Sequence, residues 1–425
     1  MVALASSYLI YQQTHSVAAV ALISVATNFP ALALASVATR LANRWGGPKL
    51  YVITLGAYYV LCVIPFLLAL AGHLSATSLL VWYLLRGIAL GLNTPSIGMV
   101  RIMLSPPGQT TEFNSAATRA VSWATLIGVL AGGFVLTQIG AAWIYLGAGI
   151  LGVPPILALV PLMPWSIPAG SSSASRFGAY FAVRRQRPDL RAAFRYTVLI
   201  SLIAGYAVTL PAVADHIGHR ADLLALLQAA AVFGGLFVVV ATRKIHGRVR
   251  WLRVQRTCVF IAAISLLFLG WAAHLQGDPP VVLLLALAAL VPLGFVLNLD
   301  ASVLNGLVQV AAPVESRAAV LTAYALIPMV ATPLSQLVIS GVADLTSVTL
   351  ALLTMGGITL LFFFLPHKLL RTSFALLDDS LQPPTPLTPF DGHHVTSMQE
   401  LCDADQPIAD QILGPELPDR RDVDG

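Results

Sequence analysis

The chain has 425 residues, of which 57% are hydrophobic and only 10% are charged, and its mean hydropathy is +0.81. An ordinary soluble domain is about 25% charged, and no single water-soluble core could bury so much apolar surface. A lipid bilayer accepts about 20 apolar residues per helix as long as every backbone group bonds within its own segment. The composition therefore excludes a soluble globular protein and predicts an all-α membrane protein.

The first apolar stretch is short. Residues 1–11 have about half the length of a membrane span, and no basic segment precedes them as a signal peptide would require. We expect them to be the outer half of a first transmembrane helix, with the natural start of the chain lying upstream.

Eleven further apolar runs are each long enough to cross a bilayer. They occupy residues 17–38, 50–72, 78–103, 118–138, 141–163, 196–214, 222–242, 256–275, 280–302, 318–341 and 347–366. Together with the first fragment, they predict about twelve transmembrane helices.

The placement of Lys and Arg tests this count independently, because these residues are retained on the cytoplasmic side of a membrane. With residues 1–11 counted as a span, the connections on one side hold nearly all the cations of the membrane body, and those on the other side hold only Arg220. Arg86 is left inside a span. The distribution predicts cytoplasmic termini and a multi-pass location in the inner or plasma membrane of the cell.

The longest internal connection, residues 164–195, divides the predicted helices six and six. We expect an N-terminal bundle at 1–163, a cytoplasmic linker at 164–195 whose basic stretch suits an anionic leaflet, and a C-terminal bundle at 196–366. Residues 367–425 carry 4 Lys and Arg against 11 Asp and Glu and are rich in Pro, Ser and Thr. Such a segment cannot offset the entropy of ordering, so we expect a disordered acidic cytoplasmic tail.

A short sequence is repeated at equivalent positions in the two predicted bundles. The second predicted helix ends in Val-Ala-Thr-Arg at residues 37–40, and the eighth ends in the same four letters at residues 240–243. Their matching position favours an internal duplication. Parallel six-helix halves are a known transporter plan, with substrate bound between them near the midplane.

Several short segments also resemble a known family. They are Asn28-Phe29-Pro30, Leu41-Ala42-Asn43-Arg44, Asn114-Ser115-Ala116, the Gly-rich segment 128–133 and the segment QVAAPVESR at 309–317. In their order and topological placement, they resemble the major facilitator superfamily, and within it the drug and siderophore exporter branch that includes the enterobactin exporter. The resemblance covers about residues 1–366 and implies two six-helix bundles.

The resemblance also implies gating residues in two cytoplasmic loops. The loop between the second and third helices usually has Gly and Asp where this chain has Thr39 and Asn43. Asn43 can form hydrogen bonds with a neighbouring helix end but cannot supply the carboxylate of the family's charged gate. The departures extend to Val129, which stands where proline is usual. The gating loop residues that the resemblance implies are Arg40, Asn43, Arg44 and Arg317.

Two ionisable residues lie within apolar runs. A charge inside a bilayer costs at least about 2.5–3.5 kcal/mol on insertion scales, so each needs a partner or a watery cavity. For Arg86, the resemblance implies a role in handling protons or substrate charge; the alternative is a buried guanidinium that serves packing alone. Asp300 lies at the inner edge of its span, or inside the cavity if the helix continues towards Val310. A buried carboxyl can exchange protons near neutral pH, which proton coupling requires.

Other residues are candidates for packing or for lining a substrate path. Gly128 and Gly132 lie four residues apart on one helix face, next to Gly133, and suit either static close packing or a moving hinge. Of the polar and aromatic residues expected to face a cavity, we select Asn93, Trp123 and Asn298 as substrate-path candidates. The others are Tyr8, Asn28, Tyr206, Gln228 and Asn305.

The sequence offers little sign of enzymatic or cofactor chemistry. His216 and His219 are close in sequence but lie in an expected solvated outer loop, and the three cysteines Cys62, Cys258 and Cys402 show no spacing for pairing or metal ligation. The chain lacks a Gly-rich phosphate loop with Lys-Ser/Thr. We expect no metal, no cofactor and no nucleic-acid partner.

The sequence therefore predicts a monomeric secondary transporter whose partners are the lipid bilayer, protons and a small-molecule substrate. Our interpretation is proton-coupled efflux of a small amphipathic molecule, such as a drug, siderophore or secondary metabolite, by alternating access. The direction of transport rests on the resemblance. The alternatives are an uptake permease on the same fold and a non-transporting membrane scaffold or sensor.

Overall fold

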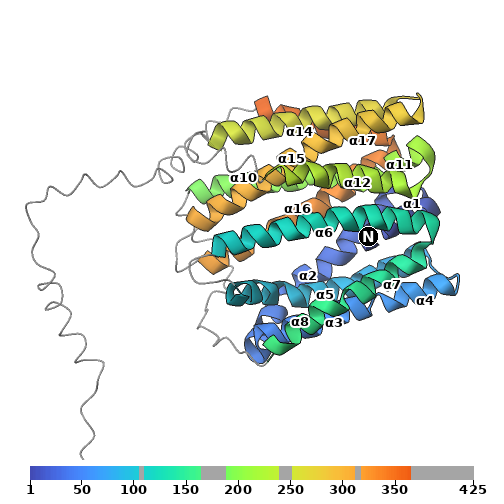
Figure 1. Ribbon diagram of the computed structural model, residues 1–425. Coiled ribbons are helices and arrows are strands. Elements are labelled where there is room, and N and C mark those ends of the chain that lie inside the picture. The colour runs from blue at the N-terminus through green and yellow to red at the C-terminus, as the bar shows by residue number, and fades with distance from the viewer. Residues whose placement is uncertain (105–109, 164–187, 239–250, 312–316, 365–425) are drawn as a thin grey trace, which may run out of the picture. The chain divides into compact units, whose positions relative to one another are not determined.

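The computed structural model describes residues 1–104, 110–163, 188–238, 251–311 and 317–364. The described residues all belong to one compact unit. All regular structure in these residues is helical, and the long helices run side by side (Figure 1). The predicted all-α class is confirmed.

The first half of the chain forms eight α-helices and a short 3₁₀ helix. They are α1 (Val2–Thr14), α2 (Val17–Trp45), α3 (Gly47–Val60), α4 (Val63–Leu70), α5 (Ala76–Leu104), α6 (Thr110–Gln138), α7 (Ala141–Leu151), α8 (Val153–Leu159) and η1 (Val160–Leu162).

The described helices of the second half follow the same alternation of long segments and short connections. They are α10 (Pro188–Ile203), the 3₁₀ helix η3 (Ala204–Thr209), α11 (Leu210–Gly218), α12 (Ala221–Leu236), α14 (Trp251–His274), α15 (Pro279–Ala311), α16 (Arg317–Leu345) and α17 (Val348–Phe364).

All eleven predicted spans overlap a helix or a run of consecutive helices, and residues 2–11 of the first fragment lie in α1. By length and composition, nine helical segments in the described residues could each cross a membrane. The helices α12 and α17 are apolar but shorter. Together with α1, these segments account for the twelve predicted positions.

Prolines explain where the predicted spans are interrupted. The run 50–72 breaks into α3 and α4 near Cys62, because Pro65 has no N–H to donate to the carbonyl of Leu61. The indole Nε1 of Trp82 donates to that carbonyl instead, at 2.7 Å. The run 141–163 is similarly divided at Gly152, just before two consecutive prolines.

Equivalent helices in the two halves pack through glycine. In the first half, a Cβ on Gly91 of α5 would lie 2.5 Å from the Cα of Ala31 in α2. In the second half, a Cβ on Gly294 of α15 would overlap the backbone of Ala231 in α12. Small residues allow backbones to approach this closely. The second and fourth spans of each half therefore meet in the same way, as an internal duplication predicts.

The two ends of the helices differ in their predicted environment. We define the predicted outer end by the connections at His15, 71–75, 139–140, 219–220, 275–278 and 346–347, which the cation distribution places away from the cytoplasm. The opposite end is the predicted inner end.

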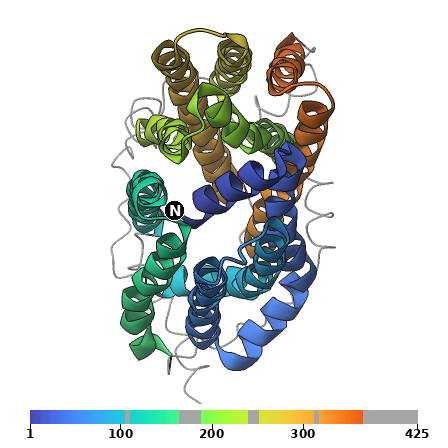
Figure 2. The same cartoon turned by 90° about the vertical axis from the view of Figure 1, so that its right-hand side faces the viewer.

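The halves of the chain contact each other mainly through α2 with α16 and α6 with α12. In the view of Figure 2, α1, coloured darkest blue, lies between helices of the first half and the green helices of the second. Contacts of α1 with α11 and α12 agree with this arrangement.

Candidate functional site

Arg86 is held among aromatic side chains in the first half. It lies on α5, and its Cζ is 4.2 Å from the ring centroid of Tyr58, 5.1 Å from that of Trp82 and 5.7 Å from that of Tyr83. One guanidinium nitrogen also donates a hydrogen bond to the Tyr58 hydroxyl. Ring faces attract a cation electrostatically, by about 2 kcal/mol or more where water is excluded. The arrangement stabilises a charged guanidinium inside a span.

The charge of Arg86 is not balanced nearby. Glu112, at the predicted inner end of α6, is the one acidic residue in the sequence of 1–163. The ion pairs found in the described residues join His219 to Asp215 and Arg220 to Asp222 instead. The Nε of Arg86 is buried and has no hydrogen-bond partner in this part of the chain. Arg86 is therefore a partly buried cation with aromatic neighbours and no described counter-charge.

A hydrogen bond between two hydroxyl groups lies beside Trp82, one of the rings that contact the guanidinium. The Ser6 hydroxyl of α1 and the Tyr145 hydroxyl of α7 form a hydrogen bond of 2.8 Å, and Tyr145 is fully buried. Trp82 packs edge-on against Tyr145, with ring centroids 5.7 Å apart. Helices α1, α3, α5 and α7 thus contribute polar or aromatic groups around Arg86. These groups hold its side chain in the interior of the first half.

Asp300 is the corresponding buried acid of the second half. Asp300 is 2% exposed. Because α15 continues past it to Ala311, the carboxyl group does not lie at a helix end. The thiol of Cys258 on α14 is close enough to form a hydrogen bond with the carboxylate. The Oδ1 atom has no described partner. Asp300 is therefore enclosed between packed helices.

Two tyrosines lie near Asp300, and a buried glutamine lies on the same helix as its neighbour Cys258. Tyr196 on α10 and Tyr324 on α16 lie within electrostatic range of the carboxylate. Gln255 is fully buried one helical turn before Cys258 on α14, and neither of its amide atoms has a hydrogen-bond partner in the described residues. Residues three apart share a helix face, so Gln255 and Cys258 point in similar directions. Buried polar atoms without a partner are costly, so their occurrence on Asp300 and Gln255 calls for an explanation.

The predicted substrate-path residues are placed separately. Asn93 on α5 is buried and accepts a hydrogen bond of 3.3 Å from the Thr54 hydroxyl, which holds α3 to α5. Trp123 on α6 is 55% exposed. Asn298 on α15 is exposed and donates to the carbonyl of Gly294 at 2.8 Å. The structure does not bring these three side chains into one cluster with Arg86.

The remaining predicted cavity residues have varied surroundings. Tyr8 donates a hydrogen bond of 3.0 Å from its hydroxyl to the carbonyl of His219, which joins α1 to the second half. Asn28 is half-buried and bonds within its own helix to Ser24. Tyr206 is buried, Gln228 is half-buried and Asn305 is exposed.

The predicted gating residues lie at the predicted inner end. Arg40 and Arg44 are exposed on the last turns of α2. Arg317 is the first residue of α16. The side chains of Asn43 and Arg317 lie outside the described residues, as does the second Val-Ala-Thr-Arg segment at 240–243.

The glycines of α6 face two different helices. A Cβ on Gly128 would be in ordinary contact with Met1, just before α1, and a Cβ on Gly132 would lie 2.9 Å from the Met1 Cα. A Cβ on Gly133 would overlap the Cβ of Ala225 on α12. The first two glycines thus allow α1 to approach α6, whereas Gly133 allows the two halves of the chain to meet.

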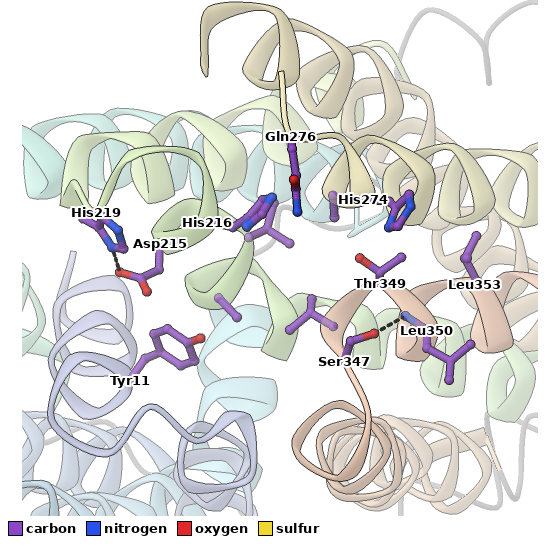
Figure 3. Close-up of a pocket in the computed structure, with 14 residues that line it drawn as sticks. Tyr11, Asp215, His216, His219, His274, Gln276, Ser347, Thr349, Leu350 and Leu353 are labelled. Atoms are coloured by element: carbon purple, nitrogen blue, oxygen red, sulfur yellow. Dashed lines mark hydrogen bonds and ion pairs between the residues drawn. The ribbon is translucent and has the colours of Figure 1, made fainter. Parts of the chain in front are cut away.

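A pocket of about 880 Å³ opens at the predicted outer end. Its lining includes His216, His219, His274, Tyr11 and Ser347 (Figure 3). The His219 ring bonds to Asp215 at 2.7 Å. No grouping of three or more His, Cys, Asp or Glu side chains suited to a metal ion occurs in the parts of the chain that the structure describes.

The sequence analysis did not identify several residues that form contacts in the structure. Gly87 and Gly91 form a Gly-x-x-x-Gly pattern that could have been identified as a packing face. Ser16 just before an apolar run was a recognisable helix cap. The contacts of Tyr58 with Arg86 and of the Asp344 carboxylate with the Ser16 hydroxyl had no local signal, because these partners lie 28 and 328 residues apart in sequence.

Comparison with known families identifies the chain's relatives. The sequence profile described as Major Facilitator Superfamily matches residues 1–336. The chain belongs to this superfamily. Members of this superfamily are multi-pass membrane transporters of the secondary type and are not generally enzymes.

Individual relatives are distant. A segment of 131 residues is 30% identical to the uncharacterized MFS-type transporter Rv1250 of Mycobacterium tuberculosis (strain ATCC 25618 / H37Rv) and covers 30% of this chain and 22% of that protein. This match therefore spans less than a quarter of the relative's length.

Two solved structures share the fold over most of their length. The nucleoside transporter NupG is 13% identical, with a TM-score of 0.61 over 88% of this chain and 94% of that one. A bacterial homolog of the human lysosomal transporter Spinster, in an inward-facing and occupied conformation, is 15% identical, with a TM-score of 0.55 over 89% and 90%. At these identities, the likeness shows the fold alone.

Proposed function

We propose that this member of the superfamily exports a small amphipathic molecule and that protons moving inward drive the export. The observation that carries the proposal is the pair of ionisable groups in the interior. In the described structure, Arg86 in the first half has aromatic neighbours and no acidic partner, and Asp300 in the second half is buried against an uncharged thiol.

The cost of these groups supports a functional role. A charge at the centre of a span costs at least about 2.5–3.5 kcal/mol on insertion scales, and intramembrane ionisable residues commonly mark ion or substrate pathways. Asp300 can gain or lose a proton, whereas an arginine remains protonated. In the proposed cycle, Asp300 exchanges the coupling proton, and Arg86 provides a fixed positive charge.

The two halves of the chain provide the movement. Residues 1–163 would rock against residues 196–366, exposing a site between them to one side of the membrane and then to the other. The assignment to the drug and siderophore exporter branch rests on the sequence segments that resemble it. We infer a monomer in the inner or plasma membrane with both termini in the cytoplasm.

Accumulation measurements test this function. An efflux-deficient bacterial host expressing the chain would be loaded with a panel of fluorescent and radiolabelled amphipathic compounds, with and without a protonophore. We expect lower accumulation of at least one compound than in the empty host, and recovery of accumulation when the protonophore collapses the gradient. A compound whose accumulation rises on expression of the chain would instead indicate uptake.

A matched variant separates proton-coupled export from a general effect of expression. Arg220→Ala removes an exposed arginine that pairs with Asp222 at the predicted outer end, and it should export like the wild type. Arg86→Ala should behave like the empty host. Equal export by both variants would contradict the proposed role of the interior charges.

A further inference from the structure

The carboxylate of Asp344 joins the two halves of the chain at the predicted outer end. Asp344 lies near the end of α16, in the second half. It accepts hydrogen bonds from the Ser16 hydroxyl at 2.5 Å, the Val17 N–H at 2.8 Å and the Ala18 N–H at 3.1 Å. All three donors belong to the start of α2, in the first half.

The geometry is that of a helix cap supplied from another part of the protein. The first N–H groups of a helix have no intrahelical partners, and the partial positive charge there favours an anion. Ser16 caps α2 through the Ala19 N–H, which donates to its hydroxyl oxygen at 3.2 Å. Asp344 binds two of the remaining N–H groups. The stability of this end of α2 therefore depends on where α16 lies.

Two other contacts join the halves at the same end. Gly133 of α6 lies against Ala225 of α12, so closely that no side chain fits between them. The Tyr8 hydroxyl of α1 donates to the His219 carbonyl at 3.0 Å. The described structure is thus closed between the halves at the predicted outer end, while Arg40 and Arg44 at the other end of α2 are exposed.

We propose that Asp344 is a positioning residue for transport, whose hydrogen bonds to the start of α2 hold the predicted outer end closed and break each time that end opens. The proposal rests on the proposed alternating-access function. A carboxylate that capped a helix of its own half would stabilise the fold without affecting the movement. Because Asp344 caps a helix of the opposite half, its contribution is present only while the two halves are together.

Hydrogen bonds to a charged group are strong enough to change a two-state equilibrium about tenfold. Replacing the Asp344 carboxylate should therefore increase the population that is open at the predicted outer end by about this factor. Asp344→Asn keeps one accepting oxygen and should have a smaller effect than Asp344→Ala. Ser16→Ala removes one donor and leaves both backbone donors, so it should also have a partial effect.

Distances between spin labels measure this population without reference to transport. One label pair, at cysteines replacing His73 and Gln276, reports the predicted outer end, since both positions are exposed and belong to different halves. A second pair, replacing Arg44 and Arg195, reports the predicted inner end. The native Cys62 and Cys258 are buried, and Cys402 would be replaced by Ser. The full chain would be studied in lipid nanodiscs.

The expected result is a longer outer distance and a shorter inner distance in Asp344→Ala, with intermediate populations in Asp344→Asn and Ser16→Ala. The matched control is Asp222→Asn, which removes an outer carboxylate that pairs with Arg220 of its own half. Its distances should equal those of the unsubstituted chain. Circular dichroism and gel filtration would show that each variant is folded.

Unchanged distances in a folded Asp344→Ala protein would overturn the proposal, and so would an equal shift in Asp222→Asn. The test is independent of the proposed export. A distance shift in a protein that exports no compound would support the role of Asp344 while refuting the exporter. Normal export in the unsubstituted chain, together with unchanged distances in Asp344→Ala, would leave the exporter standing and refute the role of Asp344.

Discussion

The guanidinium of Arg86 contacts Tyr58 in two ways: its Cζ lies 4.2 Å from the ring centroid, and a terminal nitrogen donates a hydrogen bond to the hydroxyl. Tyr58 belongs to α3 and Arg86 to α5, so this contact fixes the cation between two helices of the first half. The two components can be separated by mutation, because phenylalanine retains the ring and lacks the hydroxyl.

Arg86→Ala should abolish transport and leave the amount of protein in the membrane near normal. Removing an uncompensated charge relieves an insertion cost of about 2.5–3.5 kcal/mol, so folding should not suffer from the loss of charge. Tyr58→Phe should retain part of the transport rate, because the ring still attracts the cation. Transport rate per unit of membrane protein is the measurement. Unchanged transport in Arg86→Ala would mean that Arg86 serves only in packing.

The number and order of the spans could be predicted from sequence because they depend on local properties. Apolar length predicted segments that are helical in the structure, and Ser16 and the glycines of α5 carried signals that could have been interpreted further. The surroundings of the charges could not be predicted. Asp300 meets side chains from α10, α14 and α16, and only the packing of these helices determines that it faces Cys258 rather than an open cavity.

Asp300→Asn should remove the pH dependence of transport if this carboxyl exchanges the coupling proton. Asparagine has nearly the same shape but cannot be ionised, so transport driven by a substrate gradient alone should persist. Transport would be measured in proteoliposomes across a range of external pH. The control is Asp278→Asn, an exposed carboxylate at the predicted outer end. A pH profile that survives in Asp300→Asn would exclude Asp300 as the proton site.

Gly91→Ala should destabilise the protein by about 1–3 kcal/mol, the usual cost of overpacking. The added Cβ would lie 2.5 Å from the Cα of Ala31, and backbone cannot move aside as a flexible side chain can. Gly56→Ala is the matched control, since nothing lies within 4 Å of its added Cβ. Alanine also favours a helix by up to about 1 kcal/mol relative to glycine, so the control should be neutral or slightly stabilising. The midpoint of thermal unfolding in detergent would show the difference.

Deleting residues 367–425 should leave most of the transport activity, because the family match ends at residue 336 and the proposed charges lie in the helices. Transport by the shortened chain would be compared with that of the full chain at equal membrane abundance. Complete loss of function, with a normal amount of shortened protein in the membrane, would favour the alternative of a scaffold or sensor that acts through its acidic tail.

Gly133→Leu should open the predicted outer end by a route different from the loss of Asp344. The leucine side chain would occupy the space of Ala225 on α12, so the halves could meet only with the outer ends of α6 and α12 further apart. The same spin-label pairs should then report a longer outer distance. Gly147→Leu is the control, because nothing lies within 4 Å of a Cβ at that position on α7. If steric separation and loss of the carboxylate displace the same equilibrium, combining Gly133→Leu with Asp344→Ala should give little further change in distance once the outer end is fully open. The opposite result would be an unchanged outer distance in Gly133→Leu and a double variant whose distance equals that of Asp344→Ala. It would show that the contact between α6 and α12 does not contribute to closure of the outer end.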